Sequence, residues 1–249
     1  MMYTYPMRAP SFPAELVADH NRVLRPQDAA GYYVNPWAEF ARMTHTGVLE
    51  RIGHGYYLAV PDHLRGHSWR PEIEGVALGI GVADYGRSRT ALMGISAARL
   101  HRAVPRALAV GIVAIDGRRT PKELSAGRVV FVTRSVNRLD LQIVDTEIVS
   151  GMMTTIEQTV VDLADRPNLG GVGPSSVSEA ITDLVGRIDW DHTVNLALAQ
   201  RKRPAVARLR WLAAAIGLSL SAPIPKQPVP SLGLRPATAV DPLPYGIEP

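Results

Sequence analysis

Residues 35–61 read NPWAEFARMTHTGVLERIGHGYYLAVP and predict a helix followed by a small hairpin. Asn35 can cap a helix that begins at Pro36, because its side-chain oxygen accepts a hydrogen bond from an otherwise unpaired N–H group. Proline suits the first helical position, where its missing donor would be unused. The helix therefore has a defined start.

The two sides of this helix differ in their side chains. At 100° per residue, the side of Trp37 also carries Phe40, Ala41 and Thr44. We expect this side to pack, with Trp37 and Phe40 in the core. The opposite side is expected to be free for contacts, and it carries Glu39, Arg42, Met43 and Thr46.

Two short extended runs, residues 48–52 and 56–60, follow the helix and flank the turn Gly53-His54-Gly55. The two glycines permit the positive φ angles of a tight hairpin. Tyr56 and Leu58 are expected in the core. Helix, glycine turn and hairpin in this order are the parts of a winged helix-turn-helix, a module that reads duplex DNA.

Length and composition describe a globular chain with one large or two modest domains, since 46% of the 249 residues are hydrophobic. The chain has no cysteine, which excludes disulfides, thiolate nucleophiles and cysteine-zinc sites. The N-terminal MMYTYPMRAP lacks the apolar core of a signal peptide, and no apolar run is long enough to cross a bilayer. We therefore expect a cytoplasmic protein with no membrane contact.

The net charge of +4 is compatible with a polyanionic partner. Residues 1–61 carry five Arg against five acidic residues, and residues 62–110 carry seven Arg against four. A basic surface for DNA would thus extend past the hairpin.

The whole chain predicts an α+β fold in three parts. These are a winged helix-turn-helix at residues 1–62, a mixed-sheet body with several helices at 63–218, and a proline-rich arm at 219–249. Eight of the last 31 residues are proline, which excludes a regular helix or a central strand there.

Apolar spacing and capping residues predict the elements within these parts. Two short helices are expected at 13–20 and 25–30, the second as the positioning helix. In the body we expect helices near 73–80 and 91–101, and then strands at 108–115, 129–133 and 139–144. From Met152 the chain is expected to be helical, with helices capped at Thr155 and Ser176 and two more at 190–200 and 204–217.

The predicted DNA-binding residues belong to the N-terminal module and the connection after it. Arg42 and Thr46 can contact base edges, where an arginine binds guanine through two hydrogen bonds. Arg22, Arg25, Arg51 and His54 are placed to meet phosphates or the minor groove, and an ordinary solvated surface is the alternative for each. The full set is Arg22, Arg25, Glu39, Arg42, Thr46, Arg51, His54 and Arg65.

A second basic cluster lies late in the chain, at residues 200–203 with Arg208 and Arg210. It can contact DNA or an acidic partner, or it can be a solvated helix end. The sequence leaves both open.

The common catalytic, cofactor-binding and metal-binding motifs are absent from the sequence. Neither common glycine-rich phosphate loop occurs. Ser96 lacks the second glycine of a nucleophile elbow, and His63 and His67 have no third ligand nearby. We expect no enzyme activity, no cofactor and no metal site.

Four stretches together resemble the AbiEi family of antitoxins, particularly its actinobacterial members. They are GVLERIGHGYY at 47–57, ALMGISAARLH at 91–101 with VPRAL at 104–108, TTIEQTVVDLA at 154–164 and DPLPYG at 241–246. The resemblance implies an antitoxin that binds its own operator, represses its operon and counteracts a partner nucleotidyltransferase toxin of the AbiEii kind.

Two other functions remain open. One is a winged-helix regulator whose second domain senses a small molecule. The other is a nuclease targeted by the winged helix, for which a solvated sheet face is the competing interpretation of its acidic residues. That nuclease would use Asp140, Asp145 and Glu147. Operator sequence and oligomeric state cannot be inferred.

Overall fold

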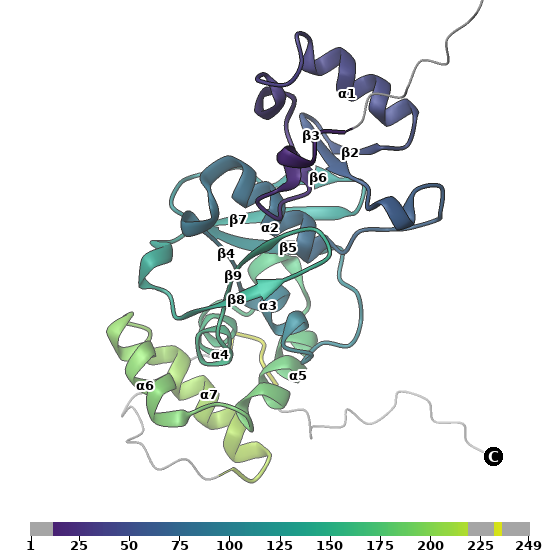
Figure 1. Cartoon of the computed structure of the whole chain (residues 1–249). Coiled ribbons are helices and arrows are strands. Elements are labelled where there is room, and N and C mark those ends of the chain that lie inside the picture. Colours follow the sequence, from purple (N-terminus) through teal and green to yellow (C-terminus); the bar gives the residue numbers. More distant parts are fainter. Residues whose placement is uncertain (1–11, 219–231, 236–249) are drawn as a thin grey trace, which may run out of the picture.

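The computed structural model describes residues 12–218 and 232–235, and this part of the chain forms an α+β fold with two sheets and seven α-helices (Figure 1). The α-helices are α1 Pro36–His45, α2 Ile73–Tyr85, α3 Gly94–Leu100, α4 Ile156–Asp165, α5 Pro174–Val185, α6 Trp190–Ala199 and α7 Arg203–Ala215. The strands are β1 Val23–Leu24, β2 Leu49–Gly53, β3 Tyr56–Ala59, β4 Thr90–Leu92, β5 Val110–Ile115, β6 Lys122–Leu124, β7 Gly127–Thr133, β8 Leu141–Asp145 and β9 Ser150–Thr154.

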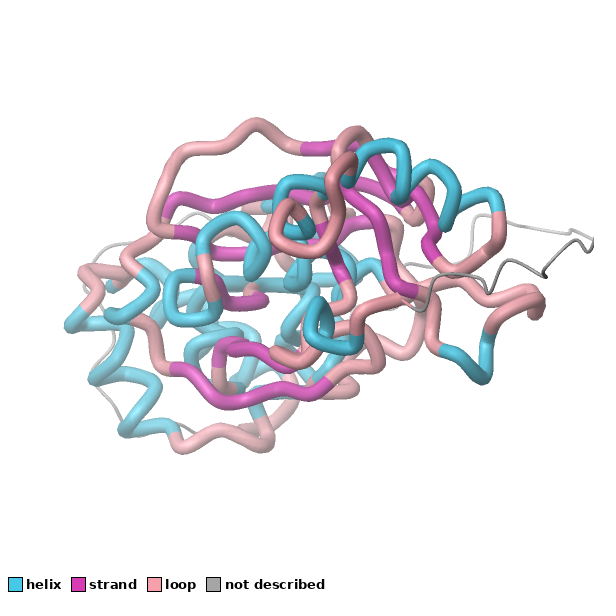
Figure 2. The backbone as a smooth tube through the Cα atoms, turned by 45° about the horizontal axis from the view of Figure 1, so that its top comes forward, coloured by secondary structure: helices cyan, strands magenta, loops and turns pink. Residues whose placement is uncertain are grey.

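The smaller sheet is antiparallel, with the order β1-β3-β2, and α1 packs on it. The larger sheet has six strands in the order β6-β7-β5-β4-β9-β8. It is mixed, because β5 runs parallel to β7 and β4 runs parallel to β9. Figure 2 shows the strands of both sheets in magenta.

Two hydrophobic cores lie on the two faces of the large sheet. β5 is buried throughout, and its side chains alternate between them: Ile112 belongs to one core, and Val113 and Ile115 to the other. This follows from the two-residue period of a strand. α2 covers the second core, whereas α3 and α4 cover the first, with α5, α6 and α7 packed behind them. These last helices lie at the end of the molecule opposite α1 (Figure 1).

The small sheet packs directly against the body. Val23 and Leu58 share a core with Val76 of α2. Gly79 lets α2 approach β1 closely, since a Cβ at this position would lie 2.6 Å from Cγ2 of Val23. The predicted boundary at residue 62 therefore falls between parts that share buried surface.

Most predicted elements of the body are confirmed. The helix near 73–80 is α2, the strands near 108–115, 129–133 and 139–144 are β5, β7 and β8, and the last two helices are α6 and α7. Thr155 caps α4, because its side chain accepts a hydrogen bond from the N–H of Gln158 at 3.3 Å.

The two short helices before α1 were predicted too long. Each is one 3-10 turn, η1 Ala14–Val17 and η2 Pro26–Ala29. Forming a single turn fixes several dihedral angles but makes few hydrogen bonds. Such segments therefore become longer helices only where tertiary packing stabilises them.

Three further predictions in the body are wrong, wholly or in part. The helix predicted at 91–101 is confirmed over Gly94–Leu100, as α3, but its start is wrong, because β4 occupies it and pairs with β5 and β9 on either side. The chain after Met152 is still a strand, since β9 continues to Thr154. Ser176 does not cap a helix: α5 begins at Pro174, whose fixed φ suits a first helical position, and Ser176 is buried.

The proline-rich arm predicted at 219–249 lies outside the described residues except for 232–235. Within that short piece Leu234 is buried in the first core, beside α5. In the parts of the chain that the structure covers, no helix has both the length and the hydropathy to cross a membrane.

Candidate nucleic-acid interface

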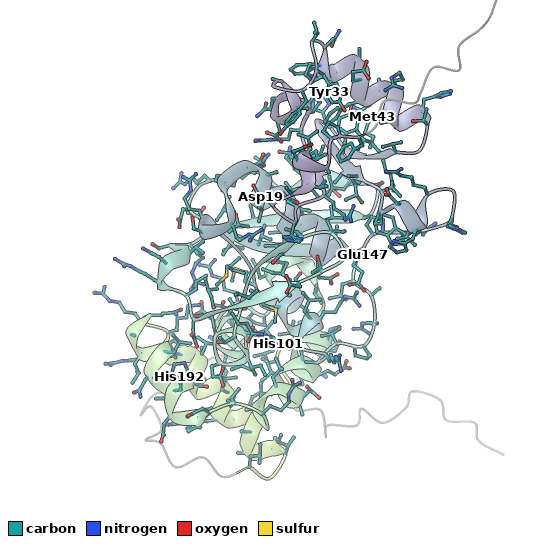
Figure 3. The ribbon with its side chains drawn as sticks, viewed as in Figure 1. Asp19, Tyr33, Met43, His101, Glu147 and His192 are labelled. Carbon is teal, nitrogen blue, oxygen red and sulfur yellow. The ribbon has the colours of Figure 1, made fainter. Side chains whose placement is uncertain are left out.

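α1 is fixed at its start and along one side. The Asn35 Oδ1 accepts from the N–H of Ala38 at 3.2 Å, as the sequence predicts. Phe40 and Met43 are buried against the small sheet, and the ring of Phe40 meets that of Tyr57 edge-on with centroids 5.2 Å apart. Figure 3 shows Met43 in this position. The helix is thus anchored by its cap and by two side chains.

The predicted faces of α1 need correction. Trp37 was expected in the core, but 62% of it is exposed, whereas Met43, expected outside, is 1% exposed. The buried side follows Pro36, Phe40 and Met43, which are spaced by four and three residues. Phe40, Tyr56 and Leu58 are buried as predicted.

The free side of α1 therefore carries Trp37, Ala41 and His45, which are four residues apart and exposed. Trp37 and His45 were not among the predicted contact residues. Their spacing of four residues is the only signal for them in the sequence. It identifies them only when the buried side of the helix is known.

Arg42 and Glu39 flank this free side and pair with each other. Nη2 of Arg42 lies 2.9 Å from Oε2 of Glu39, and 38% of the arginine side chain is exposed. Thr46 ends the helix, and its hydroxyl donates to the carbonyl of Met43 at 3.1 Å. Arg42 must leave Glu39 before it can bind a base or a phosphate with all its donors.

The hairpin presents Arg51 and His54 to solvent. The side chain of Arg51 makes no hydrogen bond or ion pair with any described residue. Its neighbour Glu50 is half-buried, and burial raises the pKa of this carboxyl group. Because adjacent side chains in a strand point to opposite faces, the exposed face of β2 carries the arginine without that acid.

The hairpin is not a free wing, because its end rests on the body. The N–H of Ser125 donates to the carbonyl of Ile52 at 3.2 Å. A Cβ on Gly53 would lie 2.5 Å from Cδ2 of Leu124, so a larger residue would require the Leu124 side chain to move. His54 and Gly55 remain exposed at the turn.

Arg25 is directed into the protein and is not available as a DNA ligand. Its guanidinium contacts Asp28 at 2.6 Å and Asp84 at 3.0 Å. The hydrogen bond with Asp28 raises the pKa of Arg25. Tyr56 and Arg119 also bind Asp84. We therefore leave Arg25 out of the candidate interface.

The other predicted basic residues lie around the small sheet. The side chain of Arg22 has no hydrogen-bond or ionic partner among the described residues. The backbone N–H of Arg22 donates to the carbonyl of Ile148 at 2.9 Å. Arg65 follows the 3-10 turn η3 Asp62–Leu64 and pairs with Asp62 at 2.6 Å. Arg87 also lies close by, since it donates to the carbonyl of Asp19 at 2.5 Å.

The residues considered for chemistry serve structural contacts. Ser96 is buried, and its Oγ accepts from the N–H of Ile112 at 2.9 Å. Asp140 accepts from Thr155 and lies 2.8 Å from Nε2 of His192. His63 lies 3.7 Å from Glu147. Among the described residues no group of three His, Asp or Glu side chains could hold a metal ion.

The arrangement as a whole offers one exposed helix side, an arginine-bearing hairpin and separate basic residues nearby. A helix of this size fits the major groove, and arginines beside it can reach phosphates on either strand.

No protein-family profile matches the chain, and no curated protein matches it significantly. Its fold is similar to that in the crystal structure of the RV2827C protein from Mycobacterium tuberculosis, with a TM-score of 0.54 and 16% sequence identity. The similarity covers 84% of this chain and 80% of the other. At this identity the likeness concerns the fold alone.

Proposed function

We propose that this protein is a DNA-binding antitoxin, which represses its own operon and counteracts a partner nucleotidyltransferase toxin. In this proposal an N-terminal winged helix-turn-helix binds double-stranded operator DNA, and the protein catalyses no reaction. One observation carries the DNA-binding part: α1 is a capped helix that is buried on one side only and lies next to an exposed hairpin turn.

The order of elements supports the winged helix. The chain runs η1, β1, η2, α1, β2, β3, and β3 lies between β1 and β2 in the sheet. A winged helix has this order, with its recognition helix in the place of α1. Because η1 and η2 are single turns, α1 would carry most of the contact with the groove.

The contacts of Arg42 suggest how binding would proceed. Its pairing with Glu39 holds the guanidinium at the edge of the free side of α1. An approaching phosphate or guanine would replace Glu39 as the acceptor. Arg42 would then need only to turn its side chain. Arg22 and Arg51 would then contact phosphates, since neither has a partner among the described residues.

Variants of Glu39 and Arg51 test DNA binding. Glu39→Gln should tighten binding to the upstream promoter duplex, because it removes a negative charge and frees Arg42. Arg51→Ala should weaken binding to all duplexes alike and lower the slope of log affinity against log salt by about one. Gel-shift titrations with the full chain at several salt concentrations measure both.

Matched controls lie at the other end of the molecule. Glu179→Gln on α5 and Arg203→Ala on α7 make the same charge changes at exposed positions, and neither should alter the affinity. If the full chain fails to shift its promoter DNA at low salt, the DNA-binding proposal is wrong.

The antitoxin part rests on the resemblance to the AbiEi family. Its test is co-expression with a neighbouring nucleotidyltransferase gene, where this protein should relieve the growth arrest. Arrest that persists, although the protein is present and binds its promoter, contradicts the antitoxin role while leaving DNA binding intact.

A further inference from the structure

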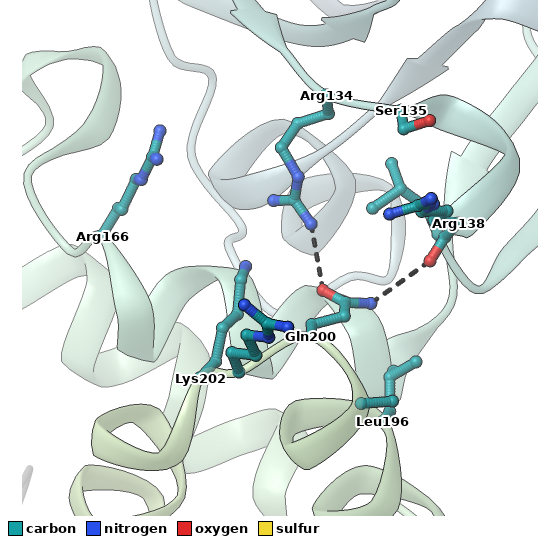
Figure 4. Close-up of a pocket in the computed structure, with 10 residues that line it drawn as sticks. Arg134, Ser135, Arg138, Arg166, Leu196, Gln200 and Lys202 are labelled. Atoms are coloured by element: carbon teal, nitrogen blue, oxygen red, sulfur yellow. Dashed lines mark hydrogen bonds between the residues drawn. The ribbon is translucent and has the colours of Figure 1, made fainter.

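A basic cavity lies between the β7–β8 connection and the corner between α6 and α7 (Figure 4). These two helices lie at the end of the molecule opposite α1 (Figure 1). Its volume is about 750 Å³. Such a volume is in the range of small-molecule sites, roughly 300 to 1,000 Å³. Its cationic side chains come from three separate segments, and they are Arg134, Arg138, Arg166, Arg201 and Lys202.

Two of these cations, Arg134 and Lys202, are held in place by acidic residues. The carboxylate of Asp162 is buried, and its Oδ1 lies 3.0 Å from Nη1 of Arg134 and 2.5 Å from Nζ of Lys202. Asp165 lies 3.4 Å from the same Nζ. Arg134 also donates to Oε1 of Gln200 at 3.0 Å, as the dashed line in Figure 4 shows. These cations need no ligand to fix their positions.

The remaining three arginines lack such compensation. The side chains of Arg138 and Arg201 have no hydrogen-bond or ionic partner among the described residues. Arg166 is exposed, and its nearest acidic group is Asp165 at 3.9 Å. Among the described residues, Asp162 and Asp165 thus balance two of the five cations and leave an excess of three positive charges.

An anion would relieve this repulsion, and arginine selects phosphate oxygens by its planar fork of donors. Arg201 has a φ of +59°, which is uncommon for a residue other than glycine and directs the chain around the rim. Leu139 and Leu196 give the cavity an apolar wall against which a ring could lie. The charge suits two or three phosphate groups, and the wall suits the rest of a nucleotide.

We propose that this cavity binds a nucleotide-sized polyphosphate ligand, such as a nucleoside triphosphate. The site is separate from the surface proposed for DNA and is a property of the body. An open cleft of this volume holds a small ligand, whereas the phosphates of a duplex extend over a much wider surface.

Calorimetric titration of the full chain tests this at about 0.15 M salt, where exposed charges are largely screened beyond about 8 Å. The probes are ATP, inorganic pyrophosphate and adenosine. ATP and pyrophosphate should bind, and adenosine should not. Tighter binding of ATP than of pyrophosphate would show that the apolar wall contributes, while equal binding would assign the ligand to the phosphates alone.

Variants locate the site. Arg138→Gln and Arg166→Gln should each weaken pyrophosphate binding about tenfold, because each removes a charged donor. Both side chains are exposed and leave the Asp162 contacts intact, so thermal melting without ligand should match the parent protein. Arg102→Gln is the matched control, since this exposed arginine does not line the cavity, and it should leave binding unchanged.

Three results would overturn the proposal. They are the absence of binding by both ATP and pyrophosphate at millimolar concentration, equal weakening by Arg102→Gln, and displacement of pyrophosphate by promoter duplex. Arg51→Ala separates this proposal from the one on DNA, because it should weaken DNA binding and leave ATP binding intact.

Discussion

His192 on α6 is the exposed residue whose charge is most directly set by a neighbour, Asp140. Its Nε2 lies 2.8 Å from Oδ2 of Asp140. That hydrogen bond, first, and the charges of Asp140 and Glu157 raise the pKa of His192 above the ordinary value of 6.5. Figure 3 places His192 among the helices at the end opposite α1. The contact links α6 to the start of β8. Protonation of the His192 ring therefore affects the contact between α6 and β8.

A raised pKa in the folded state means that the protonated ring stabilises the protein. The contribution is complete below the pKa of unfolded histidine and is lost as pH rises through the folded-state pKa of His192. We expect NMR titration to give His192 a pKa above the ordinary value, and Asp140→Asn to bring it back down. Asp145→Asn removes an exposed carboxylate elsewhere in β8 and should leave the titration unchanged. An unaltered curve in Asp140→Asn would show that the contact is absent in solution.

α1 is the element on which the proposed DNA contacts depend, and its start is defined by one side chain. Asn35 supplies the acceptor for the first turn, and Pro36 supplies the fixed φ. Among the residues that the structure describes, Asn35 is the one whose side chain caps this helix at its N-terminus. Its first turn carries Trp37, so the cap also positions the free side.

Asn35→Ala should lower the free energy of unfolding by about 1 kcal/mol, because the N–H of Ala38 loses its acceptor. Urea unfolding followed by circular dichroism measures the loss. Asn35→Ser keeps an acceptor at this position and should stay within a few tenths of a kcal/mol of the parent, roughly. Equal losses in the two variants would mean that the asparagine acts through something other than the cap. The same alanine variant should weaken promoter binding if the first turn of α1 enters the groove.

Asp84 joins the small sheet to the body at the scale of the whole molecule. Its side chain is 9% exposed, and it accepts from Nη1 of Arg25 at 3.0 Å and from the hydroxyl of Tyr56 at 2.8 Å. Arg119, which follows β5, contacts both Asp84 and Tyr56. One carboxylate in α2 thereby meets three segments, and it links β3 of the small sheet to the body.

Asp84→Asn should destabilise the protein by about 1 to 3 kcal/mol, because it leaves two largely buried arginines without their shared counter-charge. Equilibrium unfolding in urea measures the change, with Asp145→Asn as the exposed control. Since Val23 and Leu58 share a core with α2, probes in α1 and in the body should report one common transition in the parent protein. Separate transitions in the parent would contradict a rigid junction.

Local signals in the chain were sufficient for several features. The capped start of α1, the glycine turn of the hairpin, the cap at Thr155 and the strands β5 and β7 all rest on interactions within a few residues or on simple periodicity. The α+β class followed from them.

Other features depended on which surfaces meet. Trp37 is exposed and Met43 buried because the small sheet accepts the side of α1 that carries Phe40. Arg25 points inward because Asp84, far along the chain, lies beside it. β4 resembles part of a helix in sequence and is a strand because β5 and β9 supply its hydrogen bonds.

The basic cavity shows the same division most clearly. The sequence indicated a cluster at residues 200–203, and the solvated helix end was an equal interpretation. Only the fold brings Arg134, Arg138 and Arg166 to that cluster and sets Asp162 beneath it. Helix caps and hydrophobic periodicity depend on residues within one or two turns, so they can be recognised along the chain. Burial and the clustering of charged side chains depend on contacts between distant segments.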